Sequence, residues 1–364
     1  AMPNLFPDLR DPAALNQLTR TIVGSDFRAP VAEQFAFEIQ RELGASSVFR
    51  AGYVGTKGTA LFQTIDGNPR TQCSPIPTNA AGTVTGCPRV DTSAGVVRLR
   101  ANAASSVYHS LQLSFDKRFS HGFITGAHYT WSAFIDDASE IFNPSSLGEV
   151  AVSQDSFNRR ADRGRSTYDR PHRFATNFVY EIPGKKVSHA AAKRIVGGWQ
   201  VGAFITLQSG SPFSPLNGSD PTLALGGIDG LVGSAIRPNL NTTLDVSRMS
   251  VEELLAAGGR SLFSTLPTCQ RITGTNTCTP VQRFGNIGRN ILRSDGIAQI
   301  DLSLMKSTKI TERHQLQFRA DFFNFGNTRN FGIPEARVSN AGFANQWGTD
   351  GGNRRIFMSL KYVF

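Results

Sequence analysis

The sequence has no long apolar run, although 40% of its 364 residues are hydrophobic. No stretch approaches the roughly 18 to 20 consecutive apolar residues that a membrane-spanning helix requires. The chain also contains 35 glycines and 18 prolines, which interrupt it too often for long helices to form. These features exclude a helical membrane protein.

The motifs of common enzymes are absent as well. The six histidines are dispersed, without the His-x-x-x-His or His-x-Glu spacing of a catalytic zinc site. Ser209 lacks the Gly-x-Ser-x-Gly elbow of a hydrolase, and the glycine-rich run 285–290 is not followed by the Gly-Lys-Ser/Thr of a phosphate loop. We therefore expect no enzyme activity, no catalytic residues, no metal site and no cofactor.

The net charge of +10 is not concentrated in a basic patch. The densest basic group, within 185–194, lies in an expected turn and has no aromatic residues interleaved with it. Grooves that bind nucleic acid combine basic and aromatic side chains. We therefore expect no nucleic-acid partner.

Only four cysteines are present, and they fall into two short-range pairs within loop-rich sequence. The Cys-x-x-Cys spacing of a metal site is missing, so the pattern favours disulfides between Cys73 and Cys87 and between Cys269 and Cys278. Disulfides indicate an oxidising compartment. No secretory signal opens the sequence, and we expect the chain to be a fragment or a processed piece.

The sequence does contain a strong alternation with a period of two. Apolar and polar residues alternate as they do on the two faces of a β-strand, for example Leu111 and Leu113 against Gln112 and Ser114. Phe204 is an exception, because it is an aromatic residue at a polar position. Nine segments predict strands in this way: 35–43, 47–58, 107–119, 123–136, 173–182, 199–208, 299–304, 315–322 and 356–364.

The connections between these segments alternate in length. Short links lie near 44, 120–121, 183–194 and 311–313, whereas long links span 59–104, 137–169, 211–294 and 326–353. Loops this long are uncommon in compact soluble domains, but short turns at one rim and long loops at the other are typical of outer-membrane barrels. We therefore expect an all-β fold, an antiparallel transmembrane β-barrel of about nine long strands with long extracellular loops and short periplasmic turns.

A secreted β-sandwich binding module is an alternative, since its strands alternate too. Here, however, one face of the longer segments carries five or more apolar residues, and the other carries Gln, Asn, Asp, Arg and Ser. Aromatic residues also gather near strand ends, as in interfacial girdles: Tyr129, Trp131, Tyr180, Trp199 and Tyr362. A small porin or adhesin-like barrel is the other alternative, and it needs a further strand at 20–23 or within 211–294.

Three loop features are interpreted as structural rather than functional. Asp136, Asp137 and Glu140 form an acidic cluster at a strand end, which we expect to be solvated. The segment 155–170 mixes five arginines with three aspartates and predicts a loop whose charges pair with one another. The capping box at 250–253 predicts a short helix.

The end of the chain carries a specific pattern. Its apolar residues share one register and finish on phenylalanine: Ile356, Met358, Leu360, Tyr362 and Phe364. A bare edge strand of this kind would promote aggregation in water. It resembles the strand by which the barrel-assembly machinery engages outer-membrane proteins, and we expect that machinery to be a partner.

Several motifs together resemble one family. Residues 284–293 read Phe-Gly-Asn-Ile-Gly-Arg-Asn-Ile-Leu-Arg, and they precede Asp-Leu-Ser-Leu at 301–304 and Leu-Gln-Phe-Arg-Ala-Asp-Phe-Phe-Asn at 316–324. Three further segments belong to the same resemblance: Tyr-Val-Gly-Thr-Lys-Gly at 53–58, Asp-Arg-Pro-His-Arg at 169–173 and Gln-Ser-Gly-Ser-Pro-Phe at 208–213. The stretch 31–364 resembles the C-terminal barrel of TonB-dependent outer-membrane receptors of the Oar-like type.

The resemblance implies a location, a role and a set of partners. It implies that 31–364 is the C-terminal part of an outer-membrane β-barrel, that 1–30 is the remnant of a preceding loop, and that the barrel surrounds an uptake channel. The implied partners are outer-membrane lipid, an N-terminal plug and barrel half outside this chain, the TonB energy-coupling complex acting through the plug, and an unknown extracellular substrate. An odd number of strands also predicts that further strands close the sheet.

The channel-facing residues follow from strand parity. On the segments 299–304 and 315–322, polar residues occupy one face, and adjacent strands would bring them together. We expect substrate contact from Gln299, Asp301, Gln317, Arg319 and Asp321.

Overall fold

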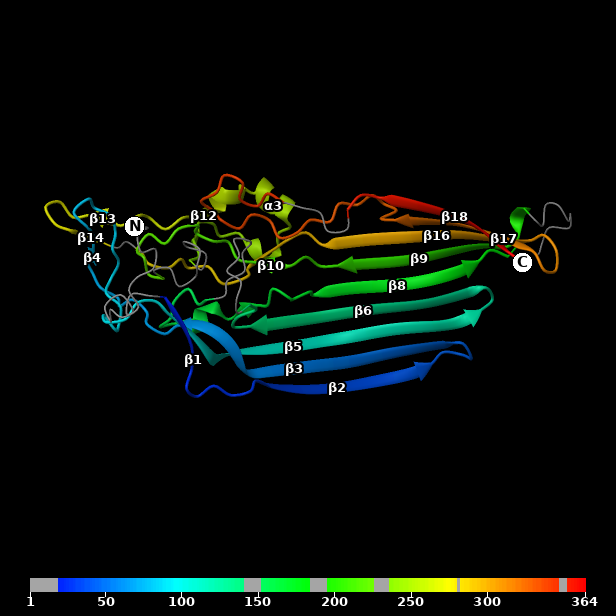
Figure 1. The fold of residues 1–364 in the computed structure, drawn as a ribbon, viewed down its shortest axis with the longest axis horizontal. Coiled ribbons are helices and arrows are strands. Elements are labelled where there is room, and N and C mark those ends of the chain that lie inside the picture. Colours follow the sequence, from blue (N-terminus) through cyan, green and yellow to red (C-terminus); the bar gives the residue numbers. More distant parts are fainter. Residues whose placement is uncertain (1–18, 141–151, 184–194, 226–235, 280–281, 347–351) are drawn as a thin grey trace, which may run out of the picture.

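The computed structural model describes residues 19–140, 152–183, 195–225, 236–279, 282–346 and 352–364. Within these residues, nine long strands follow one path across a sheet, in the order β18–β17–β16–β9–β8–β6–β5–β3–β2 (Figure 1). Every neighbouring pair on this path is antiparallel. The strands are β2 (Val31–Glu42), β3 (Ser47–Asp66), β5 (Val97–Ser120), β6 (Phe123–Asp136), β8 (His172–Glu181), β9 (Trp199–Gln208), β16 (Ile297–Lys309), β17 (Gln315–Phe323) and β18 (Arg355–Val363).

The remaining elements are short. Helix α3 (Val251–Ala256) begins with the predicted capping box, in which Ser250 Oγ accepts the Glu253 N–H at 3.1 Å and Glu253 Oε2 accepts the Ser250 N–H at 2.8 Å. No helix in the described part of the chain is long and apolar enough to cross a membrane. The other elements are β1 (Arg20–Val23), β4 (Ile76–Pro77), β7 (Gly164–Arg165), β10 (Pro212–Phe213), β11 (Asn239–Leu240), β12 (Phe263–Ser264), β13 (Gln270–Arg271), β14 (Thr277–Thr279), β15 (Leu292–Arg293) and the 3-10 turns Arg159–Asp162, Val246–Arg248 and Gly259–Leu262.

The strands form where the alternation predicts them, and their register keeps the two faces separate. Leu111 of β5 lies opposite Trp131 of β6, whereas the next pair is Gln112 with Thr130. Because side chains alternate along a strand, this register gives the whole sheet one apolar and one polar face. The prediction of nine antiparallel strands is therefore confirmed for the described residues.

Short turns join the strands at one end of the sheet. His121 and Gly122 connect β5 to β6, and both have positive φ, 54° and 78°. Two central residues with positive φ form the hairpin turn whose twist matches that of the flanking strands. The predicted short turn near Gly44 is also present, closed by a hydrogen bond of 2.8 Å from the Leu43 N–H to the Ser47 carbonyl.

Strands β3 and β5 extend much further than the alternation predicted. The expected link 59–104 is wrong, because residues up to Asp66 in β3 pair with β5 from Arg98 onward. The register shifts after Gly58 and again after Leu61, so the period-two pattern is interrupted where the strands continue.

The segment 1–30, expected to be loop, contains strand β1. Its residues pair in parallel with β5, from Arg20 opposite Val97 to Val23 opposite Arg100. There β5 runs beyond the end of β6, so its backbone groups need another partner. Since β1 lies off the path of long strands, it does not supply the extra barrel strand that a small porin would need.

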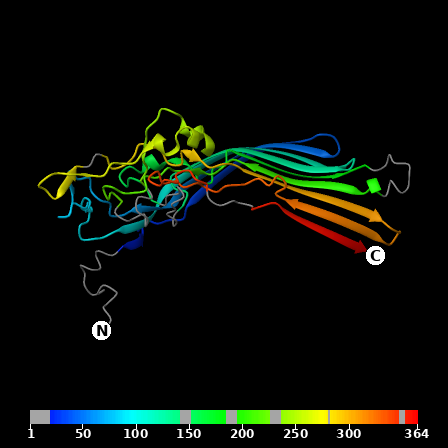
Figure 2. The ribbon, with the colours of Figure 1, turned by 90° about the horizontal axis from the view of Figure 1, so that it is seen from above.

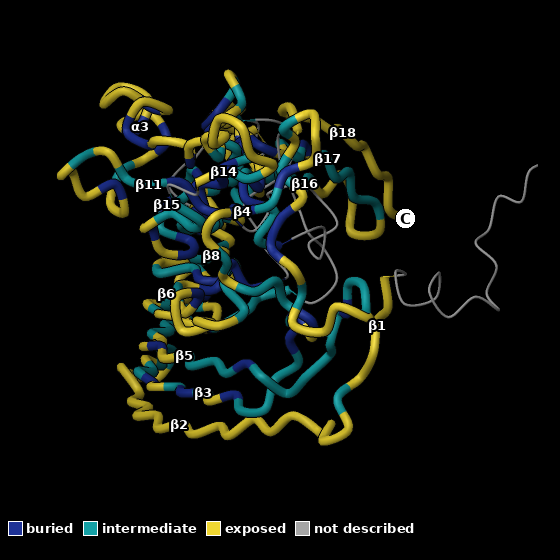
Figure 3. Tube along the Cα trace, turned by 90° about the vertical axis from the view of Figure 1, so that its left-hand side faces the viewer, coloured by how far each residue is buried: buried dark blue, intermediate teal, exposed yellow. Residues whose placement is uncertain are grey.

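The sheet is curved and single-layered. Viewed along its strands, it bends into an arc whose two edges are β2 and β18 (Figure 3), and from above the blue and red edge strands lie on opposite sides of it (Figure 2). Its apolar side chains lack a second layer to cover them: Leu111 is 37% exposed, Trp131 57% and Met358 68%. A β-sandwich would bury these residues, so the fold is a partial transmembrane β-barrel.

The largest apolar core lies in the long loops, not in the sheet. Phe213, Leu216, Ile236, Leu254 and Val338 are all essentially buried there and belong to one cluster. The described loop residues of 209–225, 236–279, 282–296 and 324–346 therefore form a packed body at one end of the strands (Figure 1).

Two disulfides cross-link the loops at the far end of this body. Cys73 pairs with Cys87 and Cys269 with Cys278, at Cα–Cα distances of 5.7 and 5.5 Å, as the spacing predicts. Strands β4, β13 and β14 form a small sheet that brings the two bridges together (Figure 1). Arg283 joins this unit by donating to the Thr71 and Cys73 carbonyls at 3.0 Å, and burial lowers the pKa of its guanidinium.

Buried arginines bind the long loops to one another. Arg237 is only 2% exposed and donates to Asp162 Oδ1 at 2.6 Å and to the Ile287 carbonyl at 2.9 Å. Arg289 donates to the Asp162 carbonyl at 2.7 Å and forms an ion pair with Asp136, which is 3% exposed. The prediction that Asp136 is solvated is therefore wrong, because this carboxylate is buried against a cation.

The expectation of a self-paired arginine loop is confirmed for one ion pair and wrong for two others. Asp162 pairs with Arg237, and Asp169 pairs with Arg293 at 2.7 Å as well as with Arg165 at 3.1 Å. Two of these three partners come from another loop. Gly285 of the glycine-rich run also serves this packing, since a Cβ there would lie 2.0 Å from the Pro238 carbonyl oxygen.

Candidate functional site

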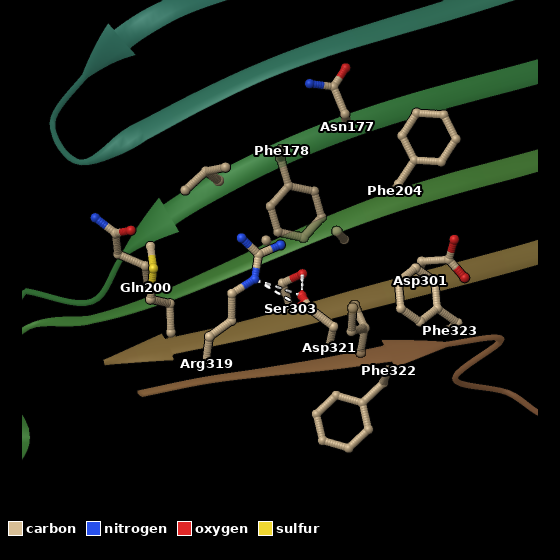
Figure 4. Close-up of a pocket in the computed structure, with 15 residues that line it drawn as sticks. Asn177, Phe178, Gln200, Phe204, Asp301, Ser303, Arg319, Asp321, Phe322 and Phe323 are labelled. Carbon is tan, nitrogen blue, oxygen red and sulfur yellow. Dashed lines mark hydrogen bonds and ion pairs between the residues drawn. The ribbon is translucent and has the colours of Figure 1, made fainter. Parts of the chain in front are cut away.

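The polar face of the sheet contains a cavity of about 360 Å³. It lies across β8, β9, β16 and β17, near the middle of these strands (Figure 4). Side chains of the polar parity surround it: Asn177, Val179, Gln200, Phe204, Asp301, Ser303, Met305, Arg319, Asp321 and Phe323. The strand register thus brings residues that are far apart in the sequence together into one site.

Gly202 forms the floor of this cavity. It lies opposite Val179 of β8 on one side and Ser303 of β16 on the other, on the polar face. A Cβ added to Gly202 would find its nearest neighbour 3.6 Å away, an ordinary van der Waals contact, so a side chain fits there without a clash. The absence of a side chain in this central position creates the hollow.

A charged network lines one wall. Arg319 Nε donates to Asp321 Oδ2 at 2.8 Å, and Ser303 Oγ donates to Asp321 Oδ1 (Figure 4). The Arg319 side chain is 53% exposed, so its guanidinium keeps donors available to a solute. Asp301 lies two residues from Ser303 in β16. It accepts hydrogen bonds from the Gln299 side chain at 3.1 Å and from the Asn324 N–H at 2.8 Å.

Apolar groups line the rest of the cavity. Phe204 and Phe323 lie at one end and Gln200 at the other (Figure 4). Phe204 is 52% exposed, which is unusual for an aromatic ring on an otherwise polar face. The site therefore offers both ring surfaces and hydrogen-bonding groups, a combination common in small-molecule sites.

Three of the five predicted channel residues line this cavity. They are Asp301, Arg319 and Asp321, whereas Gln299 and Gln317 lie outside it on the same face. Gln317 is one row nearer the short turns, opposite Ser307 and Lys361. Whether any of them contacts a substrate stays a prediction.

The sequence reasoning missed the contribution of β8 and β9. Asn177 and Gln200 are on the predicted polar parity of their strands, but their link to β16 depends on β9 pairing with β16 across the long loop 209–296. Phe204 was the available signal, since it broke the polar parity. In the described residues, no group of three or more His, Cys, Asp or Glu is placed to hold a metal ion.

The apolar face carries aromatic girdles near both ends. Toward the long loops, Tyr53 bonds His109 at 2.6 Å and Tyr129 bonds His172 at 2.8 Å. Toward the short turns, Lys306 Nζ lies 4.7 Å above the ring of Trp199.

The apolar stretch of β6 fits within a membrane. From Phe123 to Trp131 it is about 27 Å long at 3.4 Å per residue, and a strand tilt of about 35–45° reduces its height to about 19–22 Å. The apolar band of outer-membrane barrels is about 25 Å tall. The exposed apolar face therefore has the dimensions of a lipid-contacting surface.

A family model described as an outer membrane beta barrel domain matches residues 2–357. The chain belongs to this family. It accordingly lies in the outer membrane, with its apolar face toward lipid, its short turns toward the periplasm and its long loops outside the cell. No curated protein sequence matches it.

Solved structures of outer-membrane proteins are similar to the chain at low identity. The outer membrane transporter YddB from Escherichia coli has 11% identity and a TM-score of 0.43, and the match covers 96% of this chain and 34% of the YddB chain. BauA, the ferric preacinetobactin receptor from Acinetobacter baumannii, has 10% identity and a TM-score of 0.41, covering 92% of this chain and 29% of its own. The ferripyoverdine receptor of Pseudomonas aeruginosa has 11% identity and a TM-score of 0.37, covering 91% of this chain and 27% of its own. The chain thus spans about a third of the length of these proteins.

Proposed function

We propose that the chain forms part of the wall of a substrate-uptake channel, as the C-terminal barrel portion of a TonB-dependent receptor of the Oar-like type. The observation that carries this proposal is the polar face, with its cavity of about 360 Å³ between β8 and β17. A solute that enters from the long-loop end meets this cavity on the inner surface of the barrel. The motifs at 284–293 and 316–324 support the family resemblance.

The energy-coupling part of the proposal concerns partners outside these residues. The edge strands β2 and β18 have unpaired backbone groups, which further barrel strands would satisfy. In receptors of this type, a plug fills the barrel and the TonB complex acts on that plug. The polar face would then contact both plug and substrate, and the charged residues Asp301, Arg319 and Asp321 are the ones we assign to the substrate path.

Filling the cavity tests the proposal directly. In the receptor that contains this chain, Gly202→Leu should block the hollow and lower uptake by at least about tenfold, because the ligand-sized space is lost. Gly52→Leu is the matched control: Gly52 is also a polar-face strand glycine where a Cβ would meet only ordinary van der Waals contacts, but it lies in β3, away from the cavity. Arg319→Ala should reduce uptake by about tenfold through the loss of a charged hydrogen bond.

The measurement is uptake of a nutrient on which growth depends only when this receptor is present. Each variant is first checked for heat-modifiable barrel in the outer membrane. Normal uptake by both Gly202→Leu and Arg319→Ala, with normal assembly, would remove the assignment of this cavity to the substrate path.

A further inference from the structure

A second cavity, of about 390 Å³, opens on the apolar face near the long-loop end. Its side-chain walls come from three strands of the sheet and from the loop above them: Tyr53, His109, Leu111, Trp131, Ala133, Arg165 and Pro171. It faces away from the substrate path, because Leu111 and Trp131 belong to the apolar parity. The wall is apolar and aromatic, with one guanidinium at its upper side.

The strand register places that guanidinium just above the aromatic girdle. One line of paired residues crosses the sheet from strand to strand. It runs from Arg165 in β7 to Ile135 in β6, Val107 in β5 and Lys57 in β3. All four residues share the apolar face. Trp131 is on the same face of β6, about 14 Å further into the membrane along the strand at 3.4 Å per residue.

The aromatic wall is held rigidly. The ring of Phe35 covers Gly55, where a Cβ would come within 2.2 Å of the ring. Tyr53 stacks on His109 and bonds its Nδ1 at 2.6 Å. Tyr53 and His109 are therefore a preorganised part of the wall, which lowers the entropy lost on binding.

The charge of Arg165 is only partly neutralised. Its partner Asp169, at 3.1 Å, is fully buried and also binds Arg293 at 2.7 Å. One carboxylate therefore serves two guanidinium groups. The Arg165 side chain is 51% exposed, so it keeps free donor capacity at the membrane surface. At the other end of this line of paired residues, Glu33 lies opposite Lys57, and its negative charge offsets that of the lysine. The net positive charge therefore lies at the Arg165 end.

We propose that this cavity is a binding site for an anionic lipid of the outer leaflet. An acyl chain would lie against Leu111 and Trp131, and the phosphate of the head group would accept hydrogen bonds from Arg165. A soluble anion would leave the apolar wall uncovered, whereas a neutral lipid would leave the guanidinium without a partner. Arginine at the head-group level and aromatic rings below it are complementary to the two ends of one such molecule.

Quenching of Trp131 fluorescence by brominated lipid measures this binding. The parent for the experiment is the receptor that contains this chain, with Trp131 as its only tryptophan and all others, Trp199 and Trp347 included, replaced by phenylalanine. It is reconstituted into vesicles that contain small fractions of brominated phosphatidylglycerol or brominated phosphatidylcholine. We expect phosphatidylglycerol to be preferred by about fivefold, the effect of one basic residue near a charged membrane surface. In this parent, added salt should weaken the preference, because the contact is electrostatic.

Variants then separate the site from general surface charge. Arg165→Gln should abolish the preference, and Arg165→Lys should retain most of it. Arg163→Gln is the matched control, since Arg163 is a rim arginine of the same loop that binds Asp137 at 2.9 Å and does not line the cavity. Variants are compared only when their β-sheet circular dichroism matches that of the parent. Equal quenching by the two lipids in the parent, an unchanged preference in Arg165→Gln, or an equal loss in Arg163→Gln would each overturn the proposal.

Discussion

At the scale of single residues, buried charge organises the extracellular half of the molecule. Asp136, the last residue of β6, and Arg289, in a long loop, are both nearly inaccessible, and they lie 153 positions apart. Arg237 and Asp162 form a second buried pair across 75 positions. A buried ion without its partner is strongly unfavourable, so each pair ties two loops together.

Removing one partner of a buried pair should have a large effect. We expect Arg289→Leu to lower the free energy of unfolding by about 3–5 kcal/mol, because Asp136 would remain buried without a cation. Urea unfolding of the vesicle-reconstituted protein, followed by tryptophan fluorescence, measures the change. Arg163→Leu is the control: its pair with Asp137 is partly exposed, and its loss should cost under about 1 kcal/mol. Equal effects of the two substitutions would contradict this account.

At the scale of secondary-structure elements, the strands have two chemically different faces. In β16, Leu302 lies on the apolar face, and the next residue, Ser303, lines the polar cavity. The same alternation recurs through the sheet because antiparallel register preserves side-chain parity from strand to strand. Neighbouring residues therefore meet different solvents.

Cysteine labelling tests this difference in one strand. The described residues contain no free cysteine, so Ser303→Cys and Leu302→Cys each add one reactive thiol there. A maleimide that does not cross membranes should label Cys at 303 and leave Cys at 302 largely unlabelled, because hydrocarbon shields the apolar face. Similar labelling of both positions in intact outer membranes would contradict the assignment of the faces.

At the scale of the whole molecule, β18 is one edge of the described sheet. Four of the residues predicted as the assembly signal lie in this strand, and Phe364 follows it with 88% exposure. Leu360 and Met358 are likewise exposed on its apolar face. The strand is thus unpaired along one edge in the described sheet, and its role as an assembly signal stays a prediction.

Deleting Phe364 should reduce insertion into the outer membrane. The expected result is a smaller heat-modifiable band in isolated outer membranes, since the terminal aromatic residue of the signal is lost. Lys361→Ala is the control, because Lys361 lies on the opposite parity of β18. An undiminished band after the deletion would remove the assembly role of this residue.

Sequence reasoning succeeded where interactions repeat locally and failed where they are long-range. Alternation identified all nine long strands among the described residues, and the capping box identified α3. The extensions of β3 and β5 were missed, because the bulges after Gly58 break the periodicity. The arginine-rich loop was assigned only in part, because Arg165 pairs with Asp169 inside it, whereas Asp162 and Asp169 also take arginine partners from a distant loop.

The amino-acid order by itself determined the strands, the two faces and the disulfide pairs, since each depends on spacing of a few residues and on whether a side chain prefers lipid or water. Only the tertiary structure decided which distant loops share a core, which arginine meets which aspartate, and which polar residues surround Gly202. Those outcomes depend on strand register and loop packing, where residues far apart in the chain compete for the same partners. Short-range periodicity does not encode that competition.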